Sequence, residues 1–295
     1  MPYFPDYLAG LIVFVLGVNI GSFLNVVVYR VPRHESIVFP ASHCPNCDKP
    51  IRPWDNIPVL SYLILRGRCR NCHEHISIVY PIIESGVGAL FLLLFLVYGL
   101  TPLLLVNVIF VCLIVPLVFI DLRYKLLPNV ITYPGMAAAF IMRILVPSQY
   151  IMQTTVNTFG IAALPVVDVQ GHSTLAPGVR IEVALLGSML GALVGGGIPW
   201  LIRQVYYVVR RQEGLGLGDV KMMLMVGAFL GWQLSILTVF IGSFCGSVAG
   251  LLVMRLRKGT LKTEIPFGVF LGPAAIVALL VGKELIEWYL GRLGK

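Results

Sequence analysis

Apolar stretches about as long as a membrane is thick recur along this chain of 295 residues, and they constrain its fold more than any other feature. A helix that crosses a bilayer needs about 20 consecutive apolar residues. Hydrophobic residues make up 58% of the chain and charged residues only 12%, against roughly 25% charged residues in a soluble domain. Because backbone groups in lipid must bond to one another, such runs favour helices. We therefore expect an all-α polytopic membrane protein.

Eight apolar runs predict eight transmembrane helices, of which the sixth is short and follows a glycine-rich turn. Their expected ranges are 8–28, 80–98, 102–120, 129–147, 181–202, 219–231, 234–254 and 267–290. The residues before the first run contain no Lys or Arg, so we do not expect a cleaved signal peptide, which needs a basic start. Eight spans place both termini on the same side of the membrane.

Glycine recurs at every fourth position in two of these runs. The positions are Gly187, Gly191 and Gly195, then Gly242, Gly246 and Gly250. Small residues at this spacing let helix backbones approach closely in lipid, where no hydrophobic force drives helices together. We interpret both sets as packing surfaces.

The distribution of Lys and Arg predicts the orientation. Four loops expected on one side carry 16 of the 22 basic residues: 29–79, 121–128, 203–218 and 255–266. The opposite side has only Arg180, Arg292 and Lys295. Cytosolic loops carry the excess of positive charge, so we expect these four loops in the cytosol and both termini in the periplasm. The same bias explains the net charge of +8 without a nucleic-acid partner.

The first cytosolic loop contains two C-x-x-C pairs. They are Cys44 with Cys47 and Cys69 with Cys72, and 21 residues separate the pairs. Two such pairs form a tetrahedral zinc site, and four thiolates leave no open position, so the zinc would be structural. Two disulfides are the alternative, but disulfides are rare in the reducing cytosol. A loop of this size also buries too little apolar surface to fold without a metal.

These expectations divide the chain into three parts. Residues 1–28 form the first transmembrane helix, 29–79 a cytosolic zinc domain, and 80–295 a membrane core of seven helices with an outer loop at 148–180. We assign no function to that loop.

Two carboxylates are expected at the same depth, at the cytosolic ends of their helices. Asp121 ends an apolar run, and Asp219 follows a glycine-rich turn that includes Gly216 and Gly218. Two close carboxylates share one proton, and such a pair can hydrolyse a peptide by acid–base catalysis. The glycines would let a substrate strand approach the backbone. Alternatively, Asp219 only caps its helix. A further acid, Glu84, lies near the start of the second span.

The sequence resembles the type 4 prepilin peptidase family. The GxGD motif at 216–219 with Lys221, and the Asp121 segment with 127–129, resemble its two catalytic motifs. Four further segments resemble the family in order and spacing: 21–32, the tetracysteine loop, 80–84, and 266–268 with 271–273. Matching segments extend over nearly the whole chain.

The resemblance implies an aspartyl endopeptidase of the bacterial inner membrane. It would remove the basic leader of type IV prepilins or pseudopilins at the cytosolic face, with Asp121 and Asp219 as the catalytic pair and Gly216, Gly218, Lys221 and Glu84 in support. Bifunctional members then methylate the new N-terminal residue, usually Phe, with S-adenosylmethionine, for which no binding residues can be assigned. Cys44, Cys47, Cys69 and Cys72 would hold Zn²⁺.

Three alternatives stay open. The chain could be a peptidase without methyltransferase activity, because no glycine-rich fingerprint for S-adenosylmethionine is present. A proton-coupled transporter also has intramembrane acids and glycine-rich helices, although its acids should lie near the midplane. A non-catalytic zinc scaffold of a secretion assembly is the third alternative.

Overall fold

The computed structural model describes residues 6–159, 177–212, 214–257 and 266–293. In these residues the regular structure is helical, and the only β-type pairings are two isolated bridges. The expectation of an all-α protein is therefore confirmed for the described part of the chain. The chain divides into two compact units, Met1–Ile120 and Asp121–Lys295. The boundary lies within helix α4 (Pro102–Tyr124), so that the last turn of this helix belongs to the second unit.

In the first unit, α1 (Asp6–Arg30) packs against α3 (Val79–Tyr98). Two glycines of α1 allow the contact, since a methyl group at Gly17 would lie 2.8 Å from Gly88 Cα and one at Gly21 would lie 2.8 Å from Glu84 Cα. Residues rise in number along α1 as they fall along α3, so the two helices are antiparallel. The cysteine loop between them contains three short helices: η1 (Val31–Arg33), η2 (Pro53–Asn56) and α2 (Leu60–Ile64).

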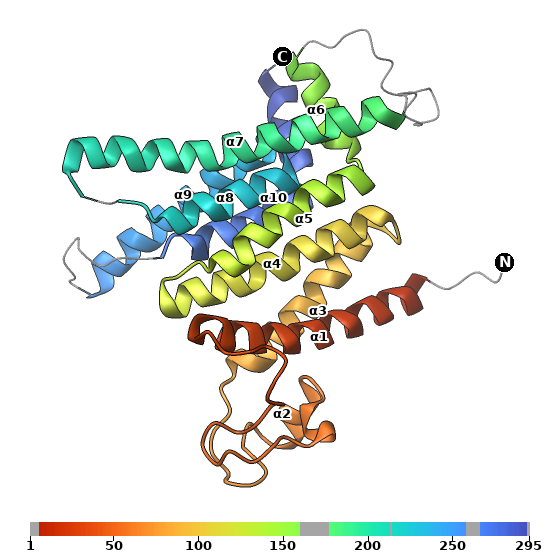
Figure 1. Ribbon diagram of the computed structural model, residues 1–295, viewed down its shortest axis with the longest axis vertical. Coiled ribbons are helices and arrows are strands. Elements are labelled where there is room, and N and C mark those ends of the chain that lie inside the picture. The colour runs from red at the N-terminus through yellow and green to blue at the C-terminus, as the bar shows by residue number, and fades with distance from the viewer. Residues whose placement is uncertain (1–5, 160–176, 213, 258–265, 294–295) are drawn as a thin grey trace, which may run out of the picture. The chain divides into compact units, whose positions relative to one another are not determined.

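The second unit is built around α8 (Leu217–Leu230), which contacts four neighbouring helices (Figure 1). Residues all around α8 are buried, including Met222, Met223 and Met225, and a helix that is apolar on every side belongs in a core. The neighbours are α5 (Asn129–Leu145), α7 (Pro177–Arg210), α9 (Trp232–Arg257) and α10 (Gly268–Leu293).

The first predicted glycine set lies where α7 meets α8. A methyl group at Gly195 would lie 2.6 Å from Met223 O, and one at Gly191 would lie 2.7 Å from Gly231 Cα. In the second set, a methyl group at Gly242 would lie 2.9 Å from Leu271 Cδ2 of α10. The prediction that these glycines mark close helix packing is confirmed at these three positions.

Judged by length and composition, fewer helices could cross a membrane than the eight expected from the sequence. Six helices in the described residues are long and apolar enough to cross a membrane: α1, α3, α4, α7, α9 and α10. A seventh span results if α5 and α6 (Gln149–Phe159), which meet at a bend of 89°, count as one. The expected span 219–231 corresponds to α8, whose 14 residues rise only about 21 Å at 1.5 Å per residue. An eight-span count is thus not confirmed.

The expected loop at 148–180 is partly helical, which corrects the sequence interpretation. Residues 149–159 form α6, and α7 begins at residue 177, while residues 160–176 lie outside the described residues. Helix α6 forms because its apolar side chains fall on one face: Met152 and Val156 pack against Val183 and Ala184 of α7. The face is short and interrupted by polar residues, so it does not stand out in the sequence.

Candidate active site

Asp121 and Asp219 are both buried in the second unit, although 98 residues separate them in the chain. Asp121 lies in the last turn of α4, which ends when Lys125 adopts a left-handed conformation with φ of 52°. Asp219 lies in the first turn of α8. Their exposed fractions are 5% and 7%. Buried carboxyl groups are costly unless they are neutral, paired or hydrogen-bonded, so two of them at helix ends require an explanation.

Gly268, the first residue of α10, lies against both carboxyl groups. A methyl group at Gly268 would lie 2.7 Å from Asp121 Oδ2 and 3.4 Å from Asp219 Oδ1. These two oxygens are therefore no farther apart than the sum of those distances. Both are buried, and neither has a hydrogen-bond partner among the described residues. The structure thus brings the two carboxylates together, with one oxygen of each directed to the same place.

The other oxygen of Asp219 is at the N-terminus of α8. Gly216 is the N-cap of this helix, and a methyl group there would lie 3.2 Å from Asp219 Oδ2. A carboxylate three residues into a helix can reach back to the N-cap and match the positive end of the helix dipole. The capping role considered from the sequence therefore fits Oδ2, while Oδ1 remains directed to Asp121.

Gly218 and Lys221, the other two predicted supporting residues near Asp219, both contact the segment that follows α4. A methyl group at Gly218 would lie 2.9 Å from Leu127 Cβ, so this glycine lets the start of α8 approach the segment after α4. Lys221 donates to Asn129 Oδ1 of α5 at 3.0 Å and lies over the ring of Tyr133. The sequence predicts that Gly218 lets a substrate strand approach the backbone, whereas its described contact is with Leu127.

Glu84 belongs to the first unit, where it supports the cysteine loop. Its Oε2 accepts a hydrogen bond of 2.7 Å from the backbone N–H of Val59, a residue with an unusual φ of 62°. Glu84 is only 7% exposed. Buried Arg30 donates to Ser36 O and Pro40 O near the start of the loop. These contacts tie the start and the middle of the loop to α1 and α3.

The four predicted cysteines lie together in this loop. Their Sγ atoms are all within 4.8 Å of one another, and Cys44 Sγ is 3.8 Å from Cys72 Sγ. A disulfide needs an S–S distance of about 2.05 Å, and all four thiols are free, so the disulfide alternative is wrong for this structure. A tetrahedral zinc site with Zn–S bonds of about 2.3 Å has S···S edges of about 3.8 Å. The cluster therefore fits Zn²⁺.

The two C-x-x-C turns are built alike. Asp48 N donates to Cys44 O in the first turn, and His73 N donates to Cys69 O in the second. In both turns the residue after the second cysteine has a positive φ, 53° at Asp48 and 58° at His73. The backbone N–H of Glu74 is the main reason that the pKa of Cys72 is lowered, whereas burial and the thiols of Cys72 and Cys44 raise the pKa of Cys47. A thiolate is the form that binds metal.

Comparisons with known proteins identify the family. Residues 15–98 match the bacterial peptidase A24 N-terminal domain, and residues 107–251 match the type IV leader peptidase family. A prepilin leader peptidase/N-methyltransferase of Pseudomonas putida is 33% identical over 95% of this chain and 93% of its own length. One from Pseudomonas aeruginosa is 31% identical over 97% of both chains. The chain belongs to the type IV leader peptidase family.

Further relatives include a prepilin leader peptidase/N-methyltransferase of Legionella pneumophila, 30% identical over 95% of this chain and 94% of its own. No solved structure matches the chain. As a leader peptidase family member with several apolar helices, the chain is a multi-pass membrane enzyme.

The cysteine cluster and the carboxyl pair of this leader peptidase family member fall in different matched regions. The N-terminal match contains the four cysteines and Glu84, and the second match contains Asp121 and Asp219. Gly268 lies beyond both matches. Sequence reasoning included 266–268 in the resemblance but gave Gly268 no role, because nothing in a linear sequence indicates which glycine faces a carboxylate.

Proposed function

We propose that this chain is an aspartyl endopeptidase that removes the basic leader from type IV prepilins or pseudopilins, and that it then methylates the new N-terminal residue with S-adenosylmethionine. The observation that carries the peptidase proposal is the meeting of the buried carboxyl groups of Asp121 and Asp219 beside Gly268. Relatives that cover nearly the whole chain are named prepilin leader peptidase/N-methyltransferase, which supports both activities.

The two carboxyl groups supply the acid and the base that peptide hydrolysis needs. Two carboxylates at close range share one proton, because both cannot ionise easily. The ionised carboxylate takes a proton from a water molecule, whose oxygen attacks the carbonyl carbon of the scissile bond. The protonated carboxyl group donates its proton to the carbonyl oxygen. The C–N bond then breaks as the first carboxyl group passes the proton it took from water to the leaving nitrogen, which becomes the new N-terminal amine. A hydroxyl group of the tetrahedral intermediate returns its proton to the second carboxylate and becomes part of the leader's new C-terminal carboxyl group.

The burial of the pair supports this role. Asp121 Oδ2 and Asp219 Oδ1 are buried, and neither has a hydrogen-bond partner among the described residues. Gly268 leaves space beside both oxygens, where a side chain would displace one of them. The N-terminus of α8 steadies Asp219 through Oδ2 without blocking Oδ1.

The cysteine cluster supports a structural Zn²⁺ held by Cys44, Cys47, Cys69 and Cys72. The metal would replace the apolar core that a loop of this size lacks. We propose this loop, residues 29–79, as a separate cytosolic domain between the first helix and a membrane core at 80–295. S-adenosylmethionine would supply the methyl group, and we assign no residue to it.

The membrane orientation is part of the proposal. In the bacterial inner membrane, the basic loops would face the cytosol and both termini the periplasm. A prepilin has a polar leader followed by an apolar helix, so its scissile bond would lie at the cytosolic boundary of the membrane. Asp121 and Asp219 would lie at that same boundary.

Purified full-length protein in lipid vesicles tests the proposal when it is incubated with a prepilin and S-adenosylmethionine. Mass spectrometry should find a cleaved product that carries one added methyl group. Asp219→Asn should abolish cleavage, whereas Glu182→Gln, which changes an exposed acid of α7, should retain it. An uncleaved wild-type reaction, or full cleavage by Asp219→Asn, would contradict the peptidase proposal. A cleaved but unmethylated product would remove the methyltransferase half alone.

A metal assay tests the cysteine cluster. Elemental analysis should find about one zinc per chain, and Cys72→Ser should lower that content sharply, since thiolates are the ligands. Cys245→Ser, which changes an exposed cysteine outside the cluster, is the control and should retain the metal. Equal zinc content in both variants would contradict the assignment.

A further inference from the structure

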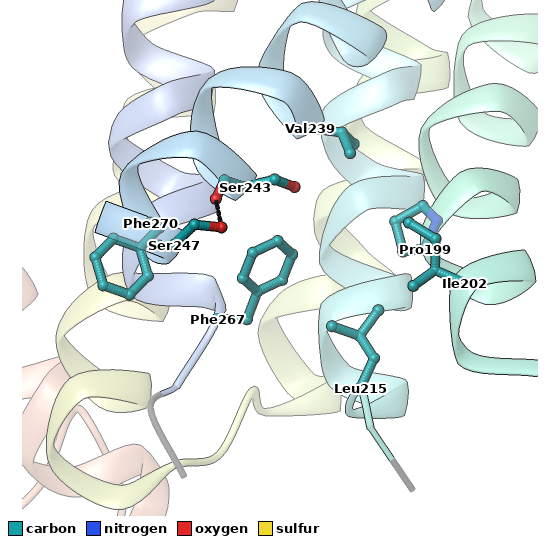
Figure 2. A pocket seen from close by; sticks show the side chains of 9 residues that line it. Pro199, Ile202, Leu215, Val239, Ser243, Ser247, Phe267 and Phe270 are labelled. Carbon is teal, nitrogen blue, oxygen red and sulfur yellow. Dashed lines mark hydrogen bonds between the residues drawn. The ribbon is translucent and has the colours of Figure 1, made fainter. Parts of the chain in front are cut away.

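The second unit contains an apolar pocket of about 350 Å³ between α7, α9 and α10. Its walls come from these helices and from the segment that precedes α8, and Figure 2 shows Pro199, Ile202, Leu215 and Phe267 around one space, with Phe270 at the left beyond Ser247. The lining residues are Pro199, Ile202, Leu215, Val239, Ser243, Gly246, Ser247, Phe267 and Phe270. Pockets that bind small groups usually start at about 300 Å³, so this one can hold a large apolar side chain.

The pocket offers little to a polar or charged group. Among the described residues, its lining contains no acidic or basic side chain. The hydroxyl group of Ser247 donates to Ser243 O at 2.7 Å, so it is engaged within α9, as the dashed line in Figure 2 marks. A lysine or arginine side chain would lose its hydration there without a compensating partner. The pocket therefore selects for apolar side chains.

Two residues that line the pocket are followed in the sequence by glycines that lie beside the carboxyl pair. Leu215 precedes Gly216, which lies beside Asp219 Oδ2, and Phe267 precedes Gly268, which lies beside Asp121 Oδ2. Neighbouring Cα atoms are only about 3.8 Å apart. Arg203 of α7 donates to Leu215 O at 3.1 Å and so holds one of these walls in place. A chain bound at the carboxyl pair could thus place a side chain in the pocket.

We infer that this pocket is the subsite for the first apolar side chain on the carboxyl side of the scissile bond. The inference rests on the proposed function. Of the two sides of that bond, the leader is basic and the remainder is apolar, so only the remainder matches the lining. An aromatic side chain that enters between Phe267 and Phe270 would gain ring contacts as well as burial.

Gly246 provides a way to fill the pocket without touching the carboxyl pair. A methyl group there would lie 3.4 Å from Phe270 Cδ2 and 3.7 Å from Phe267 Cε2, which are ordinary contacts. A leucine side chain would extend into the space between these rings. Gly197 of α7 offers a matched control, since a methyl group there would meet nothing within 4 Å.

The test compares two prepilin peptides that differ only in the residue after the scissile bond, Phe or Ala. Full-length enzyme in vesicles cleaves both, and the readout is the ratio of their kcat/KM values. Gly246→Leu should lower the Phe-to-Ala ratio by about 10-fold or more, as expected for a side chain excluded from an apolar pocket. Gly197→Leu should leave the ratio at the wild-type value. A ratio that is unchanged in Gly246→Leu would overturn the subsite.

Phe270→Ala provides an independent variant if Gly246→Leu does not fold. It enlarges the pocket, so cleavage of a peptide with Trp at this position should rise relative to the Phe peptide. An unchanged Trp-to-Phe ratio in this variant would also overturn the subsite, and the pocket would then hold a lipid chain or serve packing alone. If wild-type enzyme cleaves none of the peptides, the proposed function fails as well. If the peptides are cleaved but both variants keep the wild-type ratios of kcat/KM, only the subsite is rejected.

Discussion

A glycine can be as important to a carboxyl pair as the two acids themselves. Gly268 is the point where Asp121 and Asp219 face one another, and its missing side chain keeps the space between them open. The carboxyl groups are short and buried, with exposed fractions of 5% and 7%, so they have little freedom to move aside.

Gly268→Ala should therefore impair cleavage far more than folding. The added methyl group would lie 2.7 Å from Asp121 Oδ2, closer than carbon and oxygen normally approach, so the Asp121 side chain must shift. A displacement of about 1 Å at a reacting group can lower the rate about 100-fold. The measurement is kcat for a prepilin, together with thermal unfolding of the same preparation.

The control for this variant is Gly291→Ala in the same helix, where a methyl group would meet nothing within 4 Å. It should retain kcat. If Gly268→Ala also cleaves at the wild-type rate, then Gly268 does not determine the geometry of the pair.

At the level of single residues, the sequence allowed more to be predicted about chemistry than about contacts. Asp121, Asp219 and the four cysteines stand out because acids at the ends of membrane helices and paired C-x-x-C turns are rare patterns with few uses. The partners of Gly218 and Lys221 did not stand out, because Leu127 and Asn129 belong to another segment that only folding brings near.

Helices α7 and α8 cross at their glycines. Gly191 and Gly227 face each other so closely that a methyl group on either would overlap the backbone of the other helix. Because α8 is surrounded by four helices, it has no free side toward which to retreat. The crossing thus fixes where α8, the helix that carries Asp219, lies along α7.

Gly191→Ala should lower the free energy of unfolding by about 1–3 kcal/mol, the usual cost of overpacking a core. Thermal unfolding in detergent measures the effect. Gly197→Ala in the same helix adds the same methyl group to open space, and there alanine should be neutral or favour the helix by up to about 1 kcal/mol. Equal melting temperatures for the two variants would mean that the crossing is not tight.

The helices themselves were largely predictable, because apolar runs are a strong signal. Every expected span corresponds to a helix, from α1 to α10. Helix α6 was missed, since its buried face is formed by a few side chains within a polar stretch. The burial of α8 was also unforeseen, because an apolar run of 14 residues looks the same whether lipid or protein surrounds it.

The whole molecule has a predicted orientation that no contact within the chain determines. It depends on the 16 basic residues gathered in four loops, which favour the cytosol. The number of spans bears on the same question, because six candidate spans among the described residues would place both termini on one side, whereas seven would place them on opposite sides.

Reporter fusions test the orientation. Alkaline phosphatase fused after Lys295 should be active, because we expect the C-terminus in the periplasm, where the enzyme folds. The same reporter fused after Arg68 in the cysteine loop should be inactive, and a fluorescent protein there should fluoresce. The reverse pattern at either site would reject the proposed orientation.

The central claim is that Asp121 and Asp219 act as one catalytic unit. Single-turnover cleavage of a prepilin by Asp121→Asn, Asp219→Asn and the double variant tests it most directly. Residues that work as a unit lose activity non-additively. We predict that each single variant loses about 10³-fold or more in rate and that the double variant is no slower than the slower single variant. A single variant with the wild-type rate, or losses that multiply in the double variant, would contradict the account.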